Sequence, residues 1–286
     1  MRFWRGTLNP YPRLKMEVHV DIETSGNAID ILAAHCPLSK QKLKQAMSKG
    51  AVWLAAKGKP QRLRRAGKTL QPGQKLHLYY DVDVLAQVPE PAILIEDCKD
   101  YSVWHKPGGM LSQGSKWSDH CTITRWAEQN LQPQRNAFLI HRLDRAASGL
   151  ILVGHSKGVT AQLCDLFQTR KLDKRYLVIV HGQFADKLTL DSPVDDKAAV
   201  SHAQLMQYDE KLNRSLVEVK IETGRKHQIR RHMAGCGHPV VGDRLHGVGD
   251  ESEDLQLTAF SLSFECPVRK VLIEFVLPQS LWPAIS

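Results

Sequence analysis

A charged segment enclosed by two apolar runs sets the strongest limit on the architecture of this chain. Residues 141–149 read His-Arg-Leu-Asp-Arg-Ala-Ala-Ser-Gly, and they lie between the apolar runs 137–140 and 149–153. Both runs have the composition of buried strands. We therefore expect Asp144 at a junction of two strands, where a rigid scaffold can hold a reactive group. By spacing alone, a surface loop whose charges pair with one another is an equal alternative.

This segment resembles the His-Arg-Leu-Asp-x-x-Thr-Ser-Gly signature of the RluA family of pseudouridine synthases, with Ala147 in place of the usual threonine. The resemblance implies an enzyme that isomerises uridine in folded RNA, with Asp144 as the catalytic residue. Asp144 would either attack the sugar covalently or remove the proton from carbon 2′, and the sequence leaves both open. The reaction needs no redox step, phosphate donor or external nucleophile, so we expect no cofactor.

A second string, residues 174–182, also resembles the family. By pattern alone it is as well explained as a core strand. The resemblance implies that Tyr176 stands in the active site, where an extruded uracil needs a stacking face and a phenol can take part in proton transfer.

Residues 222–232 resemble the family string Thr-Gly-Arg-x-His-Gln-Ile-Arg-x-His nearly position for position. The resemblance implies that Arg230 pairs with Asp144, and a guanidinium there would keep the carboxylate ionised and oriented. Arg225 and Lys226 lie near an expected helix start and can hold phosphate. We expect no metal, because His227 and His232 lie on poorly matched helix faces and no His-Glu-x-x-His order is present.

The closing strands, residues 257–267 and 275–278, complete the resemblance and imply that Leu277 packs against the base opposite the tyrosine. Core packing explains Leu277 equally well. The full set of expected substrate-binding residues is Arg142, Tyr176, Arg225, His227, Arg230 and Leu277.

Composition is compatible with an RNA enzyme. The net charge of +9 and the pI near 9.3 favour a polyanionic partner. The six cysteines are widely separated and form no Cys-x-x-Cys, which argues against a zinc ribbon and a disulfide framework and indicates a reducing cytoplasm. No apolar run approaches the ~20 residues of a membrane span, and no signal peptide is evident. We expect a cytoplasmic monomer that does not contact membranes.

Pro89 and Pro91 mark a linker between two expected domains, residues 17–85 and 89–286. The first carries a net charge of +5 and should contain helices at 28–36 and after Ser39, with strands at 51–54 and 75–80. It resembles the αL RNA-binding domain of a small-subunit ribosomal protein. A solvated charged face is the alternative to a phosphate-contacting surface. The residues expected to contact phosphate are Lys40, Lys42, Lys44, Arg62, Arg64, Arg65 and Lys68.

In residues 89–286, strand-like runs at 176–180, 215–221, 255–264 and 271–277 outnumber the expected helices at 156–170 and 225–234. The sequence therefore predicts an α+β fold, in which helices flank a mixed, mainly antiparallel sheet, beside a small N-terminal α+β domain.

The predicted function is isomerisation of specific uridines in structured RNA. Large-subunit ribosomal RNA is favoured, because family members with an αL domain resemble those that act on it. The alternatives are a tRNA pseudouridine synthase and a non-catalytic RNA-binding or ribosome-assembly factor on the same scaffold. An esterase or another hydrolase with an aspartate nucleophile is disfavoured, because neither a His-Asp-Ser order nor a Gly-x-Ser-x-Gly turn is present.

Overall fold

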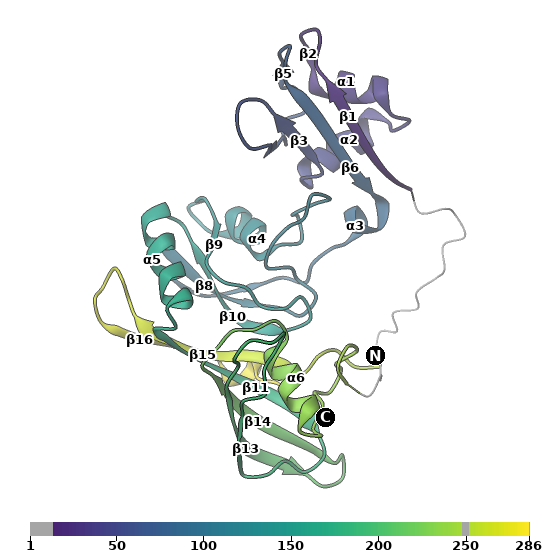
Figure 1. The fold of residues 1–286 in the computed structure, drawn as a ribbon. Coiled ribbons are helices and arrows are strands. Elements are labelled where there is room, and N and C mark those ends of the chain that lie inside the picture. The colour runs from purple at the N-terminus through teal and green to yellow at the C-terminus, as the bar shows by residue number, and fades with distance from the viewer. Residues whose placement is uncertain (1–13, 248–251, 286) are drawn as a thin grey trace. The chain divides into compact units, whose positions relative to one another are not determined.

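The computed structural model describes residues 14–247 and 252–285. The chain forms two compact units, which are drawn in Figure 1. The first comprises the described residues up to Val88 together with Gly114–Cys121, and the second comprises Pro89–Gln113 and the described residues from Thr122 onward.

The N-terminal unit is a four-stranded antiparallel sheet, ordered β1-β6-β3-β4, packed against two helices. The side chain of Ser39 accepts a hydrogen bond from the Lys42 amide at the start of the second helix, as the sequence predicts. Leu32 and Leu43 are fully buried in the same cluster as Leu78. The elements are β1 (Lys15–Asp21), β2 (Gly26–Asn27), α1 (Ala28–His35), α2 (Lys40–Ser48), β3 (Val52–Ala55), β4 (Gln61–Arg62), β5 (Thr69–Leu70), β6 (Lys75–Asp81) and α3 (Val82–Ala86).

Two arginines of this unit that are predicted to contact phosphate, Arg62 and Arg64, hold the segment Gly114–Cys121. The Arg62 guanidinium donates to the Ser115 carbonyl at 2.6 Å and pairs with Asp119 at 3.0 Å. Arg64 pairs with the same Asp119 carboxylate. Both guanidinium groups are thus engaged inside the unit, and their contact with phosphate stays a prediction. Lys40 pairs with Asp30 at 2.5 Å. The other predicted contacts are exposed: Lys42, Lys44, Arg65 and Lys68.

The larger unit contains a ten-stranded sheet whose main path is β12-β13-β14-β11-β15-β10-β8-β7. Every pairing in it is antiparallel except that of β10 with β15, so the predicted α+β class and mainly antiparallel sheet are confirmed. The elements are β7 (Ile93–Asp97), β8 (Tyr101–Lys106), α4 (Ile123–Asn130), β9 (Phe138–Leu139), β10 (Ser148–Gly154), α5 (Lys157–Gln168), β11 (Leu172–His181), β12 (Lys187–Leu190), β13 (Ser201–Asp209), β14 (Arg214–Ile221), α6 (Gln228–Gly235), β15 (Leu257–Glu265), β16 (Leu272–Val276) and a 3₁₀ turn (Gln279–Leu281).

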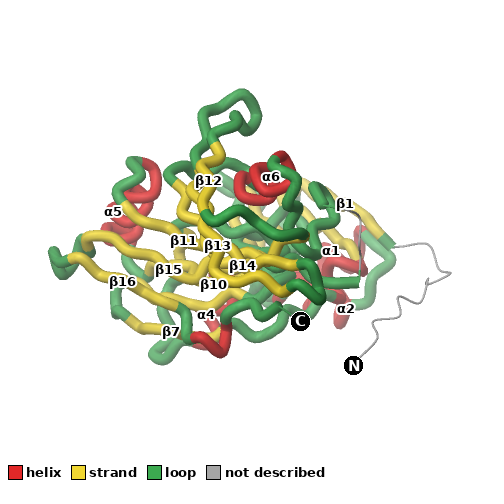
Figure 2. The backbone as a smooth tube through the Cα atoms, turned by 90° about the horizontal axis from the view of Figure 1, so that it is seen from below, coloured by secondary structure: helices red, strands yellow, loops and turns green. Residues whose placement is uncertain are grey.

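Helices α5 and α6 pack on different parts of this sheet, as Figure 2 shows. Leu163 of α5 lies in a buried cluster with Leu152 of β10. Met233 of α6 lies in another cluster with Val178 of β11 and Val217 of β14. No helix in the two described ranges has the length and apolarity needed to cross a lipid bilayer.

The parallel contact of β10 with β15 is short and depends on one glycine. It pairs Ser148 with Thr258 and Gly149 with Ala259. Gly149 has a φ of +114°, and a Cβ placed there would lie 2.3 Å from the Ala259 carbonyl oxygen. Only glycine fits this conformation and approach. The end of the charged segment is therefore fixed directly against β15.

Candidate active site

The loop that carries Asp144 is fixed on both sides of that residue. On one side, the Ser112 hydroxyl donates to the Leu143 carbonyl at 2.8 Å and accepts from the Leu143 amide at 3.0 Å. On the other side, the Gly109 amide donates to the Arg145 carbonyl at 2.8 Å. These bonds hold the backbone around Asp144 in one conformation, as a reactive group requires.

The fully buried Lys106 supports the same loop from beneath. Its ammonium group donates to the Ala147 carbonyl at 2.6 Å and to the Met110 carbonyl at 3.0 Å, and it contacts the Arg145 carbonyl at 3.4 Å. Burial lowers the pKa of Lys106 to about 7, and the nearby charge of Asp144 opposes that shift. Lys106 thus connects the backbone of Arg145 and Ala147 to the turn that follows β8.

Asp144 lies beside Arg230, as the sequence predicts, but only one nitrogen of the guanidinium faces it. Nη1 of Arg230 is 3.5 Å from Oδ2 of Asp144. The rest of the guanidinium binds Asp243, through Nε at 2.8 Å and Nη2 at 2.5 Å. Asp243 also accepts from the amides of Leu245 and His246. Burial would raise the pKa of Asp243, but these hydrogen bonds outweigh burial and bring the pKa down to about 2.

His227 approaches Asp144 from the start of α6. Its Nε2 is 3.8 Å from Oδ2 of Asp144, and its Nδ1 is 3.0 Å from Nε2 of His246. Burial lowers the pKa of His227, and the charge of Asp144 opposes this. His227 has a φ of 55°, a left-handed conformation that is uncommon for a residue with a side chain. Helix α6 therefore begins at Gln228, three residues later than predicted.

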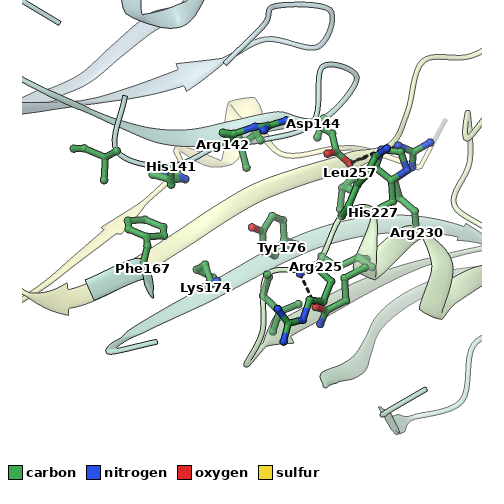
Figure 3. Close-up of a pocket in the computed structure, with 18 of the residues that line it drawn as sticks. His141, Arg142, Asp144, Phe167, Lys174, Tyr176, Arg225, His227, Arg230 and Leu257 are labelled. Atoms are coloured by element: carbon green, nitrogen blue, oxygen red, sulfur yellow. Dashed lines mark hydrogen bonds and ion pairs between the residues drawn. The ribbon is translucent and has the colours of Figure 1, made fainter. Parts of the chain in front are cut away.

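A cavity of about 670 Å³ opens beside Asp144 and contains Tyr176 near its middle (Figure 3). Burial raises the pKa of the Tyr176 phenol, and the nearby charge of Asp144 raises it further, so the phenol keeps its proton at neutral pH. Ile221 and Leu257 add apolar surface to the lining. The cavity thus combines an aromatic ring and apolar walls with one carboxylate.

Leu277 does not line this cavity, which corrects its predicted contact with the base. Its side chain is 1% exposed and lies in the core cluster that contains Phe260 and Phe275. Leu257, at the start of β15, lines the cavity instead and is 5% exposed. The sequence alone did not separate these two leucines, because both belong to apolar strand runs of the same type.

The turn before α6 is built around the buried side chain of Gln228. Its Oε1 accepts from the Thr223 hydroxyl at 2.6 Å and from the Arg225 amide at 3.1 Å. The Arg225 side chain donates to the Ala198 carbonyl at 3.1 Å. This network places Arg225 and Lys226 at the cavity.

The cavity has a strongly positive lining. Among the described residues that line it, Asp144 is the single carboxylate. The cationic lining residues are Arg142, Arg170, Lys174, Arg225, Lys226 and Arg230. Such a lining suits a phosphate-bearing ligand.

Several residues of this site were missed in the sequence. The pairing of Asp243 with Arg230 is one of these, because the spacing of the two residues in the sequence gives no sign of it. Lys106 precedes the Pro-Gly-Gly turn, and a lysine next to a turn is ordinarily expected at the surface. His232, at which no metal is expected, contacts the Ser201 hydroxyl at 2.9 Å and the Ser192 carbonyl at 2.9 Å.

Comparisons with known proteins identify the family to which the chain is similar. Residues 100–235 match the family model described as RNA pseudouridylate synthase. A tRNA pseudouridine synthase C of Vibrio parahaemolyticus is 34% identical over 176 residues, which cover 52% of this chain and 71% of that protein. A protein of Aquifex aeolicus named as an uncharacterised RNA pseudouridine synthase is 27% identical over 257 residues, covering 82% of this chain and 79% of the relative.

The fold is similar to that of a solved human structure, RNA Pseudouridylate Synthase Domain Containing 1. The TM-score is 0.58 at 21% identity, and the match covers 68% of this chain and 86% of the human one. The fold, the family match and the identity to the Vibrio relative lead to one conclusion: the chain belongs to the RNA pseudouridine synthase family and is an isomerase that acts on uridine in RNA.

Proposed function

We propose that Asp144 is the catalytic residue and that the reacting uracil binds between it and Tyr176. The observation that carries this assignment is the place of Asp144 as the single carboxylate among the described lining residues. In the reaction the bond from N1 to carbon 1′ breaks, uracil rotates, and carbon 5 bonds to carbon 1′ as its proton leaves. An ionised carboxylate serves either attack at carbon 1′ or proton removal at carbon 2′.

The neighbouring residues take distinct roles in this proposal. Tyr176 supplies the ring on which the uracil stacks, opposite the apolar side chain of Leu257. Arg230 orients Asp144, and His227 approaches the same carboxylate oxygen from the start of α6. Arg142 and Arg225 bind phosphates of the RNA. A non-catalytic RNA-binding protein would have no use for a carboxylate held in this way within a cationic cavity.

The proposed substrate is large-subunit ribosomal RNA, with the N-terminal unit as an αL-type RNA-binding domain. The exposed cations Lys42, Lys44, Arg65 and Lys68 support this role. They are free to meet phosphates, whereas Arg62 and Arg64 hold the inserted segment.

A tRNA is the second candidate substrate, because the Vibrio relative is named a tRNA pseudouridine synthase C. That match covers 52% of this chain, so it leaves much of the chain unmatched. Mapping pseudouridines in ribosomal RNA and tRNA from cells with and without this protein decides between the two.

Activity itself is tested by incubating the protein with RNA that carries tritium at carbon 5 of uridine. Release of tritium to water is expected from the native protein. Binding of the RNA without any release would assign the chain to RNA binding alone and would overturn the catalytic role of Asp144.

A further inference from the structure

The active-site cavity continues beyond Tyr176, away from Asp144. Figure 3 shows His141, Phe167 and Lys174 at one end of the cavity and Asp144, His227 and Arg230 at the other, with Tyr176 between them. Lys174 and Tyr176 are two residues apart on β11, so their side chains leave the same face of the strand about 7 Å apart. We call the part lined by Phe167, Arg170 and Lys174 the distal end.

Lys174 brings a positive charge to the distal end, where the described lining residues include no carboxylate. Within the described part of the chain, its ammonium forms no ion pair, and its nearest aromatic partner is Phe167, 6.0 Å from the ring centroid. Burial lowers the pKa of Lys174, and the charge of Arg170 lowers it further. A partly buried cation without a counter-charge is unfavourable, and an arriving anion would relieve that cost.

Arg170 occupies a backbone position that usually belongs to glycine. It follows the end of α5 with a φ of 59°, and the next amide, that of Lys171, donates back to the Leu166 carbonyl at 3.0 Å. This helix ending favours glycine, because a left-handed backbone crowds a Cβ. Residues held in such conformations cluster at binding sites. An exposed arginine here brings charge to the cavity at the expense of helix stability.

The wall of the distal end is rigid and flat. The His141 ring stacks on Phe167 with 4.1 Å between centroids and 13° between planes. Nε2 of His141 accepts from the Leu152 amide at 3.0 Å, and burial lowers the pKa of His141 to about 3, so the ring is neutral and fixed. Two cations beside a flat neutral wall suit a phosphodiester with an attached nucleoside.

We propose that the distal end binds the phosphodiester of the nucleotide next to the reacting uridine, through Lys174 and Arg170. This inference rests on the proposed function, because it takes the uridine to lie between Asp144 and Tyr176. The site would read the RNA chain adjacent to the target and help to hold the flipped nucleotide in place.

The test measures binding in the full chain carrying Asp144→Asn, so that no turnover occurs. Two probes are titrated over a range of salt: fluorescein-labelled pentauridylate, and uridine 5′-monophosphate as a competitor. In this background Lys174→Gln should weaken pentauridylate binding at low salt by about tenfold. The slope of log affinity against log salt should flatten by about 0.7. Affinity for the mononucleotide should stay unchanged, because a single nucleotide does not reach the distal end.

Three further variants separate binding from folding. Lys174→Arg keeps the charge and should retain the affinity of the background protein. Arg170→Gly should lower pentauridylate affinity while leaving the thermal midpoint equal or higher, a combination that a structural role for Arg170 does not produce. Lys187→Gln, an exposed lysine on β12 outside the cavity, is the matched control and should change nothing.

Two outcomes overturn the inference. If Lys174→Gln keeps the salt slope of the background protein, no phosphate binds there. If Lys174→Gln weakens the affinity for the mononucleotide as much as the affinity for the pentauridylate, Lys174 binds the phosphate of the target nucleotide itself. Tritium release is measured separately with Asp144 intact, so loss of the proposed activity is distinguishable from loss of the distal site.

Discussion

At the scale of single residues, Arg230 divides one guanidinium between two carboxylates. Its two-point contact goes to Asp243, and only Nη1 faces Asp144, at 3.5 Å. Asp243 holds the Arg230 guanidinium in place. The position of this guanidinium beside Asp144 is therefore fixed by Asp243 and not by Asp144. In the described contacts of Asp144 only Oδ2 is engaged, which leaves Oδ1 available to the substrate.

Replacing Asp144 by Asn should abolish turnover and leave RNA affinity near normal. The amide keeps the size and polarity of the side chain but is neither a useful nucleophile nor a base. The rate of tritium release should fall at least ~10²–10⁴-fold. A rate within tenfold of the native protein would show that another residue performs the chemistry.

Replacing Arg230 by Lys should reduce kcat/KM sharply while the fold persists. Lysine keeps the charge but cannot make the two parallel hydrogen bonds to Asp243, so the cation beside Asp144 loses its fixed position. Tritium release and circular dichroism measure the two effects. Normal rates in this variant would mean that the contact with Asp144 is unimportant.

The low pKa of Asp243 predicts how the free energy of unfolding depends on pH in acid. Its pKa is about 2 in the folded protein against 3.8 for the free group, so its stabilisation is complete above pH 3.8 and is lost as pH falls through 2. The shift corresponds to about 2 kcal/mol at neutral pH. Asp243→Asn lacks this contribution, so the stability difference between native protein and variant should shrink by about 1 kcal/mol from pH 5 to pH 3. Urea unfolding at several pH values measures it, and a constant difference would contradict the assignment.

At the scale of elements, the two-residue pairing of β10 with β15 positions the loop of Asp144. Gly149→Ala should destabilise the protein by about 2–3 kcal/mol, because the added methyl group meets backbone atoms of Ala259 that cannot turn away. Activity should fall with it, since the loop begins only a few residues earlier. Urea unfolding and tritium release measure both effects.

Gly158→Ala is the matched control for that change. Gly158 lies in the first turn of α5, and an added Cβ there meets no atom within 4 Å. Helix propensity favours alanine, so stability should stay equal or rise by up to ~1 kcal/mol. Equal effects of the two substitutions would mean that the close approach at Gly149 does not matter.

Elements with local signals could be predicted from the sequence, and those fixed by distant partners could not. Ser39 and Ser156 begin α2 and α5 as expected, because a capping hydroxyl acts within three residues. Strand β13 was missed because its polar side chains hide the apolar alternation. The start of α6 depends on Gln228, which also binds Val200 and Ser201 from another part of the chain. In the candidate site, motif resemblance located Asp144, Tyr176 and Arg230, whereas Leu257 needed the three-dimensional cavity.

At the scale of the whole molecule, the exposed cations of the N-terminal unit should contribute to RNA affinity without affecting chemistry. Changing Lys42, Lys44, Arg65 and Lys68 to Gln should flatten the slope of log affinity against log salt by roughly 0.7–0.9 per lost contact. The expected kinetic defect is a raised KM with kcat retained at saturating RNA. Fluorescence anisotropy and tritium release provide the two readouts.

A charge-matched control removes four exposed lysines of the larger unit, Lys187, Lys197, Lys211 and Lys270. If both quadruple variants flatten the salt slope equally, the effect comes from net charge alone. The basic face of the N-terminal unit would then be an ordinary solvated surface.

The segment Gly114–Cys121 is encoded inside the larger unit and folds with the smaller one, so the backbone passes between the units three times. A single cut in the gene therefore cannot separate the two units, because it either divides the smaller unit or removes Pro89–Gln113 from the larger one. A gene cut after codon 88 would leave the remaining protein with Trp117 and Asp119 but without Arg62 and Arg64, which hold that segment. Removal of the complete smaller unit, with the larger one left whole, involves two separate stretches of the gene.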